Sequence, residues 1–240
     1  PVCIQHQTTT TRPANHCPNR SVLGILNRNG AFAQRTSLPP QNLHIVPESI
    51  TNDQATLVEP LAAAFQVQRQ LELAEFAEVA VIGDGRLGYL CAQVLNQAGC
   101  QVTVIGRHDN KLQKFAALGL STYHSDENPA SRPCDLAVDC CGSESGIATA
   151  LKWLRPQGTL VLKTTVTKQH QIWLAPLVID EITVLGSRCG PFDIALQALA
   201  QQQVEVDSLI TARRPLAQAL EAFELAASGE HMKVILDIAE

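Results

Sequence analysis

The sequence predicts an α/β protein whose larger part is a doubly wound parallel sheet, with a second module formed by the two ends of the chain. Three observations favour this fold class. Short apolar runs alternate with amphipathic stretches from residue 78 onward, and three closely spaced glycines follow the first run. The tail of the chain then departs from this alternation. Neighbouring parallel strands need a crossover connection, and that connection is usually a helix.

The region before residue 78 predicts a different kind of module. Residues 30–39 and 42–47 are short runs that polar residues interrupt and that Gly and Pro bound, which is typical of antiparallel strands. Residues 50–71 are rich in Ala, Leu and Gln, and Thr51 or Asn52 can cap a helix there. We therefore expect two short strands followed by a helix.

The alternating region predicts strands and helices in turn. Its short apolar runs suit strands that are buried on both faces of a parallel sheet. We expect strands at residues 78–83, 101–106, 134–142, 158–165 and 181–188, and helices at residues 87–99, 110–119, 144–154 and 192–203. The tail then returns to another module, with a helix over residues 216–229 between the segments 207–215 and 232–238.

Composition and charge exclude several classes of protein. The chain has 240 residues, 45% of them hydrophobic, which suffices for one large or two modest domains. Its formal net charge is −5 and its Lys and Arg residues form no run, so we expect neither nucleic acid nor a membrane surface as a partner. It contains no apolar stretch of the roughly 20 residues that a membrane-spanning helix needs, and no signal segment, which favours a cytoplasmic location.

A glycine-rich turn is the strongest functional motif. Gly83, Gly85 and Gly88 have the spacing G-x-G-x-x-G between a predicted strand and a predicted helix. In such a turn Gly83 permits a tight bend, Gly85 lets the backbone approach a pyrophosphate, and Gly88 lets helix and strand pack closely. The N–H groups near Arg86 and Leu87, at the positive end of the helix dipole, would bind the diphosphate. The alternative is a purely structural turn.

The end of the second predicted strand bears on the choice of coenzyme. Proteins that prefer NAD carry Asp or Glu there to bind the ribose 2′-hydroxyl. This chain has Gly106 followed by Arg107. A glycine leaves room for a 2′-phosphate and the guanidinium supplies a planar cation, so we expect NADP rather than NAD. The alternative is that Arg107 is an ordinary solvated residue.

Four segments of the chain resemble a known family. Residues 16–47 (HCPNRSVLGILNRNGAFAQRTSLPPQNLHIVP), 58–67 (VEPLAAAFQV), 79–95 (VAVIGDGRLGYLCAQVL) and 186–192 (GSRCGPF) resemble successive segments of the zinc-type medium-chain dehydrogenases. Members acting on alcohols, polyols, sugars or threonine are the most similar. The resemblance implies a Rossmann dinucleotide-binding domain, residues 59–204, inserted in a partial GroES-like catalytic domain made of residues 1–58 and 205–240.

The resemblance also implies further coenzyme contacts. Lys111 matches a basic residue near the adenosine ribose, although a solvated helix lysine is an equal alternative. Cys141 and Gly142 would line the coenzyme cleft after the fourth predicted strand. The backbone around Lys163, Ser187 and Cys189 would contact the nicotinamide carboxamide.

The structural zinc lobe of the family is only partly present. Its four cysteines are spaced C-x2-C-x2-C-x7-C, and counting back from Cys17 places the other three at Thr9, His6 and Cys3. A structural zinc needs a closed set of four ligands, and a threonine hydroxyl is a poor one. We therefore expect that this lobe has lost its ion.

The catalytic zinc site is incomplete as well. The resemblance places Glu59 at the position of one zinc ligand, whereas a helix N-terminal carboxylate is an equal alternative. The family's early Cys and its Gly-His-Glu motif are missing from the sequence. Zinc is thus expected in a full-length parent rather than in this chain, and no catalytic residue is assigned.

Together these features predict an NAD(P)-dependent oxidoreductase that transfers hydride between NADP or NAD and an alcohol, polyol or sugar-type substrate. The alternative is a degenerate or non-enzymatic NAD(P)-binding protein without the catalytic zinc site. A third reading, a zinc-independent reductase, would need a positioned general acid that the sequence does not reveal. By analogy with the family, the chain would form a homodimer or homotetramer through the predicted strand 181–188.

Overall fold

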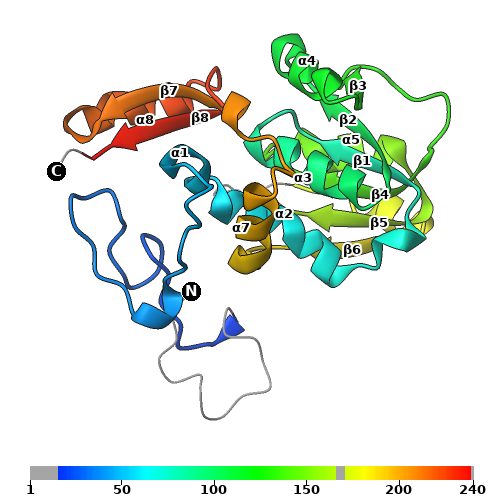
Figure 1. The fold of residues 1–240 in the computed structure, drawn as a ribbon. Coiled ribbons are helices and arrows are strands. Elements are labelled where there is room, and N and C mark those ends of the chain that lie inside the picture. Colours follow the sequence, from blue (N-terminus) through cyan, green and yellow to red (C-terminus); the bar gives the residue numbers. More distant parts are fainter. Residues whose placement is uncertain (1–15, 166–170, 239–240) are drawn as a thin grey trace. The chain divides into compact units, whose positions relative to one another are not determined.

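The computed structural model describes residues 16–165 and 171–238 (Figure 1). These residues form two compact units. The larger unit is continuous, Glu48–Asp207, and the smaller one combines the residues up to Pro47 with those from Ser208 onward. The expected domain limits and the GroES-like identity of the smaller unit stay predictions.

The larger unit is built on a six-stranded, entirely parallel sheet with the strand order β3-β2-β1-β4-β5-β6. Its strands are β1 (Glu78–Ile82), β2 (Gln101–Gly106), β3 (Ser121–His124), β4 (Cys134–Asp139), β5 (Leu154–Leu162) and β6 (Thr183–Gly186). The order reverses between β1 and β4, and in sheets of this kind ligands bind outside the carboxyl ends of the strands at that point. The predicted fold class is confirmed.

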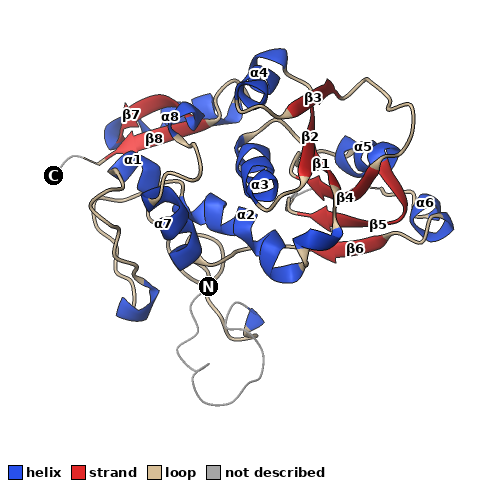
Figure 2. Cartoon of the chain, turned by 45° about the vertical axis from the view of Figure 1, so that its right-hand side comes forward, coloured by secondary structure: helices blue, strands red, loops and turns tan. Residues whose placement is uncertain are grey.

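Helices cover both faces of the sheet. The described helices of this unit are α1 (Asn52–Ala55), α2 (Val58–Gln70), α3 (Arg86–Gln97), α4 (Asp109–Ala117), α5 (Ser145–Trp153), α6 (Ala175–Ile179) and α7 (Phe192–Ala200), of which α3, α4 and α5 pack directly on its strands. Figure 2 shows α3 and α5 on opposite faces. On the α5 side, Ala80 and Ile82 of β1 belong to a buried apolar cluster with Trp153. Val79 and Val81 of the same strand are also fully buried, as the continuous apolar run predicts.

Local signals fix the helix ends. Thr51 caps α1 through a capping box with Gln54, in which each side chain bonds the other residue's backbone N–H. The cap is where the sequence predicts it, but the single helix expected over residues 50–71 is divided into α1 and α2, and no side chain caps α2. Gly99 and Gly119 follow α3 and α4 with φ of 94° and 80°. Left-handed backbone of this kind ends a helix, and glycine adopts it without a steric penalty.

The smaller unit contains a second, two-stranded sheet. Strands β7 (Ile210–Pro215) and β8 (Lys233–Asp237) pair in parallel, and α8 (Ala219–Ala227) connects them. Phe223 of α8 meets Phe32 edge-to-face with 5.2 Å between the ring centroids. This aromatic pair joins the N-terminal segment to the C-terminal one within the unit.

The two strands expected near the N-terminus are a wrong prediction. Residues 30–39 and 42–47 are irregular, apart from a 3₁₀ turn at Pro40–Asn42. Proline removes backbone donors here, and a strand needs a partner to which it can bond. Ile45 is 93% exposed, so the apolar residues of this segment are not held in a core of the described residues.

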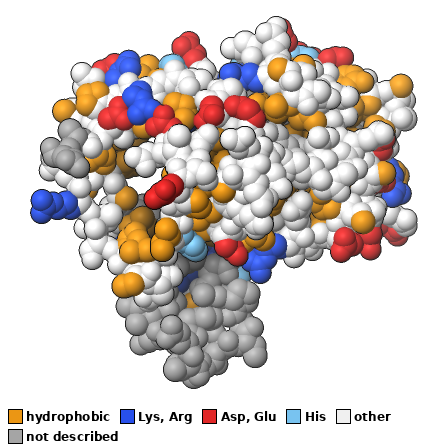
Figure 3. All heavy atoms as spheres, viewed as in Figure 1, with side chains coloured by type: hydrophobic (Ala, Val, Ile, Leu, Met, Phe, Trp, Pro, Cys, Tyr) orange, Lys and Arg blue, Asp and Glu red, His pale blue; other side chains and the backbone are white. Residues whose placement is uncertain are grey.

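The surface and the helix lengths agree with the composition. On the face drawn in Figure 3, Lys and Arg side chains are scattered and form no continuous patch. In the portion of the chain that the structure describes, every helix is too short or too polar to span a bilayer.

Candidate functional site

The glycine turn follows β1 at the point where the strand order reverses. Gly83 has φ of 117°, and a Cβ placed on it would lie 2.9 Å from the Cα of Cys141. A Cβ on Gly88 would lie 2.0 Å from the carbonyl oxygen of Gly83. Both positions are therefore closed to any side chain, because the turn, helix α3 and the end of β4 are in contact there.

Gly85 differs from the other two glycines. It is the N-cap of α3 with φ of −87° and ψ of −178°, and a Cβ placed on it meets no atom within 4 Å. No side chain caps α3, whose first turn starts with Arg86 and Leu87. The positive end of the 12-residue helix α3 is therefore not capped by a side chain, and the backbone at Gly85 beside it is accessible. Such a helix start suits an anion such as a diphosphate.

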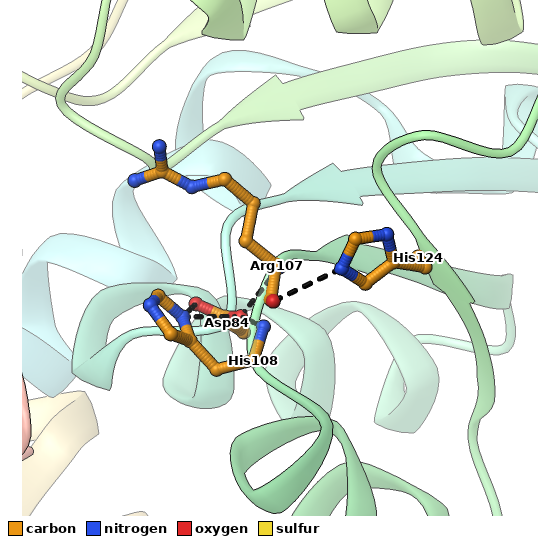
Figure 4. A network of polar contacts seen from close by, with 4 residues as sticks. All are labelled: Asp84, Arg107, His108 and His124. Atoms are coloured by element: carbon orange, nitrogen blue, oxygen red, sulfur yellow. Dashed lines mark hydrogen bonds and ion pairs between the residues drawn. The ribbon is translucent and has the colours of Figure 1, made fainter.

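Asp84, inside the same motif, is the residue that the sequence analysis missed. Its carboxylate is buried, and its Oδ2 accepts the backbone N–H groups of Arg107 and His108, each at 2.7 Å (Figure 4). Nδ1 of His108 lies 2.9 Å from the same oxygen. A carboxylate accepts only, so Nδ1 carries a proton. Burial raises the pKa of Asp84, but the His108 and Arg107 N–H groups outweigh burial and lower that pKa.

The backbone of Arg107 is held from both sides. Its N–H bonds Asp84, and its carbonyl oxygen accepts a hydrogen bond from Nε2 of His124 at 3.0 Å. The N–H of Asp126 points to Nδ1 of His124 at 3.4 Å, which fits the tautomer with the proton on Nε2. The side chain of Arg107 is exposed and extends away from the Asp84 carboxylate (Figure 4).

The structure corrects the idea that Gly106 leaves free room at the strand end. A Cβ on Gly106 would lie 2.6 Å from Cβ of Asp84, 2.7 Å from its Oδ2 and 2.8 Å from Leu112. The Asp84 side chain fills this space. A carboxylate is therefore present at the end of β2, but it comes from the turn after β1.

The other predicted contacts lie after β4, β5 and β6. Lys163 is buried, and its Nζ donates to the carbonyl oxygen of Ala63 and to Oγ of Ser187, the latter at 3.1 Å. Burial lowers the pKa of this ammonium. Ser187 is buried as well, and Cys189 has a left-handed backbone with φ of 58°.

The thiol after β4 is protonated at neutral pH. Burial raises the pKa of Cys141, whose Sγ donates to Oδ1 of Asp139 at 3.0 Å. A thiol in this state is a poor nucleophile, which supports a packing role. Gly142, with φ of 64°, turns the chain away from the strand end.

The structure brings the predicted site residues into two groups. The first joins the turn, from Gly83 to Gly88, with Gly106 and Arg107 through Asp84. The second joins Lys163 and Ser187. Lys111 is buried in α4, with its N–H bonded to the carbonyl oxygen of His108, and its expected contact with the ribose stays a prediction.

The described residues offer no ligand set that fits a zinc ion. Glu59 is exposed in the first turn of α2. Within residues 16–165 and 171–238, no three His, Cys, Asp or Glu side chains are placed to share a metal. Of the structural lobe, Cys17 is buried, while Cys3, His6 and Thr9 lie outside the described residues.

Comparison with known proteins gives a consistent set of relatives. A family profile described as zinc-binding dehydrogenase matches residues 87–203. The chain is 25% identical to D-xylulose reductase A of Aspergillus oryzae, over 92% of the chain and 67% of the relative. It is 25% identical to D-arabitol-phosphate dehydrogenase of Enterococcus avium (98% and 72%) and 28% identical to rat sorbitol dehydrogenase (80% and 58%). It spans 58% to 72% of the length of these three proteins.

Solved structures share the fold. L-idonate 5-dehydrogenase of Escherichia coli superimposes with a TM-score of 0.85 at 19% identity, over 93% of this chain and 69% of that one. A short chain alcohol dehydrogenase of E. coli, complexed with NADH, gives 0.81 at 22% identity over 93% and 70%. TarJ of S. aureus, in complex with NADPH, gives 0.69 at 20% identity over 80% and 66%.

Proposed function

We propose that this chain, a relative of the zinc-type medium-chain dehydrogenases, binds NADP or NAD through its larger unit and acts in hydride transfer with an alcohol or polyol. One observation carries the proposal. In the glycine turn Gly83 and Gly88 are packed against backbone, whereas Gly85 faces open space at the start of α3. This is the arrangement that lets a pyrophosphate approach the backbone.

The relatives support the reaction class. They include reductases and dehydrogenases of xylulose, sorbitol and arabitol phosphate, and structural neighbours bind NADH or NADPH. The expected NAD(P)-dependent, alcohol-type oxidoreductase agrees with these relatives, and a small alcohol or polyol is the expected substrate.

The chain's own residues bind and orient the coenzyme. The N–H groups at the start of α3, around Arg86 and Leu87, would hold the diphosphate, and Arg107 would face the adenosine ribose. The backbone at Cys141, Lys163 and Ser187 would line the nicotinamide end. When bound, the nicotinamide supplies the hydride carrier.

NADP is the proposed preference over NAD. The exposed guanidinium of Arg107 stands at the end of β2, where a 2′-phosphate would lie. A planar guanidinium bonds a phosphate with two parallel hydrogen bonds.

No step of the reaction is assigned to zinc, because Glu59 has no companion ligands among the described residues. Turnover of a polyol by the chain distinguishes the enzyme from a coenzyme-binding protein without activity. A homodimer or homotetramer through β6, whose Val184 is 45% exposed, and a cytoplasmic location stay predictions.

Fluorescence titration tests the function. NADPH and NADH are added to the chain, and the change in their emission is followed with ADP-ribose as a competitor. We expect saturable binding that ADP-ribose reverses, with NADPH binding more tightly. Absence of binding by both coenzymes would contradict the proposal.

A further inference from the structure

At the end of β2, a carboxylate from the turn after β1 occupies the space that a side chain at Gly106 would need. The Cβ and Oδ2 of Asp84 lie 2.6 and 2.7 Å from where a Cβ on Gly106 would be. An acidic side chain at position 106, the usual means of binding a ribose diol, therefore cannot be accommodated while Asp84 is in place.

Asp84 is not available as a substitute for that acidic residue. Its Oδ2 already accepts two backbone N–H groups, those of Arg107 and His108, and Nδ1 of His108 lies against both oxygens at 2.9 and 3.1 Å. The side chain is only 10% exposed. Ribose hydroxyls would have to displace hydrogen bonds that hold the loop.

The negative charge of Asp84 is compensated where it stands. Three N–H donors converge on it, and hydrogen bonds to a charged group are among the stronger ones in proteins. These N–H donors would thus reduce the electrostatic repulsion between the Asp84 carboxylate and a 2′-phosphate near Arg107.

The backbone of Arg107 is held by hydrogen bonds, whereas its side chain extends outward. Asp84 binds its N–H and His124 binds its carbonyl oxygen at 3.0 Å, while the guanidinium points away from both (Figure 4). Asp84, from the turn after β1, and His124, at the end of β3, therefore fix the backbone from which the guanidinium extends.

We propose that Asp84 is a positioning residue that selects the 2′-phosphorylated coenzyme: it fills the space at Gly106 and, through the N–H groups of Arg107 and His108, holds the Arg107 guanidinium toward the 2′-position. This inference rests on the proposed coenzyme binding. It assigns selectivity to a residue inside the glycine turn rather than to the strand end alone.

The test compares ligands that differ only in the 2′-phosphate. The Kd values of 2′,5′-ADP and 5′-AMP, and of NADPH and NADH, are measured by calorimetry for the wild-type chain and for Asp84→Ala, Asp84→Asn and Arg107→Ala. Asp109→Ala is the matched control, because it removes an exposed acid from the first turn of α4, directly after His108. Circular dichroism and thermal melting confirm that each variant is folded.

If Asp84 is a positioning residue, its two variants should differ in their preference for the 2′-phosphate. Asp84→Ala removes the acceptor of two backbone N–H groups and should reduce the preference for the 2′-phosphate about tenfold, with 5′-AMP little changed. Asp84→Asn keeps an oxygen for those N–H groups and should retain most of the preference. Arg107→Ala should abolish the preference, and Asp109→Ala should leave it within about twofold of wild type.

Other outcomes overturn the inference. If Asp84 acts by charge alone, both of its variants would bind 2′,5′-ADP more tightly than wild type. If it binds the ribose diol, both would weaken 5′-AMP and NADH. If Asp84→Ala does not fold, the other two variants still test the inference. Arg107→Ala that keeps the preference for the 2′-phosphate, or Asp84→Asn that loses it, contradicts a positioning role of Asp84. A wild-type chain that binds neither coenzyme contradicts the proposed function itself.

Discussion

At the scale of single residues, Asp84 joins the turn after β1 to the loop after β2. Its carboxylate lies among three N–H donors from Arg107 and His108. Such a group stabilises the folded chain only while it is ionised, because a protonated carboxyl accepts these hydrogen bonds less well.

This linkage predicts an acid-labile contribution to stability. The pKa of Asp84 in the folded chain is below its ordinary value of 3.8, so its contribution is fully present above about pH 4 and is lost as the pH falls through the folded pKa. Urea unfolding from pH 6 to pH 3 should show the wild-type chain losing more free energy of unfolding than Asp84→Asn. Parallel pH curves for the two proteins would contradict this.

The three glycines of the turn could be located from the sequence, whereas Asp84 could not be assigned a role. G-x-G-x-x-G is a local spacing, and its context between a strand and a helix is also local. The partners of Asp84 stand 23 and 24 residues further along the chain, and only the pairing of β1 with β2 brings them together. A carboxylate within a phosphate-binding turn was the one signal that could have prompted the question.

At the scale of elements, the contact of α3 with β1 positions the turn. Gly88 is the point of closest approach, because its missing Cβ would overlap the carbonyl oxygen of Gly83. Helix and strand can therefore approach only if position 88 carries no side chain.

Gly88→Ala should destabilise the chain by about 2 kcal/mol, the usual cost of overpacking a tight contact. The free energy of unfolding by urea measures the loss. Ala is otherwise the better helix former, and it would favour α3 by up to about 1 kcal/mol. An unchanged or raised stability would show that α3 moves freely away from the turn.

Element prediction succeeded where the pattern is local and buried. The apolar runs of β1, β2, β4, β5 and β6 predict strands in a parallel sheet, and Gly99 and Gly119 mark the ends of helices. Strand β3 was missed because Ser121–His124 is short and polar, with no fully buried residue. The wrongly predicted strands at 30–39 and 42–47 are short runs that polar residues interrupt, and they pair with no strand among the described residues.

At the scale of the whole molecule, the described residues form a continuous larger unit and a smaller unit made of both ends of the chain. The tail, with β7, α8 and β8, joins the N-terminal segment through the Phe32 and Phe223 rings. The larger unit carries the glycine turn and both groups of predicted contacts. Coenzyme binding is therefore a property that this unit's residues alone should provide, whereas the catalytic groups stay unassigned.

The most direct measurement is a calorimetric titration of the wild-type chain and Gly85→Ala with NADPH. Ala fits the backbone and the space at this position, so the melting temperature of the variant should equal that of wild type. Gly30→Ala, in the smaller unit, is the control substitution.

If the start of α3 binds the coenzyme diphosphate, the wild-type chain and Gly30→Ala will give saturable heats, and Gly85→Ala will bind at least about tenfold more weakly, because its methyl group occupies the approach to the backbone. Equal affinity of Gly85→Ala and wild type, or no heat from the folded wild-type chain, would contradict the assignment.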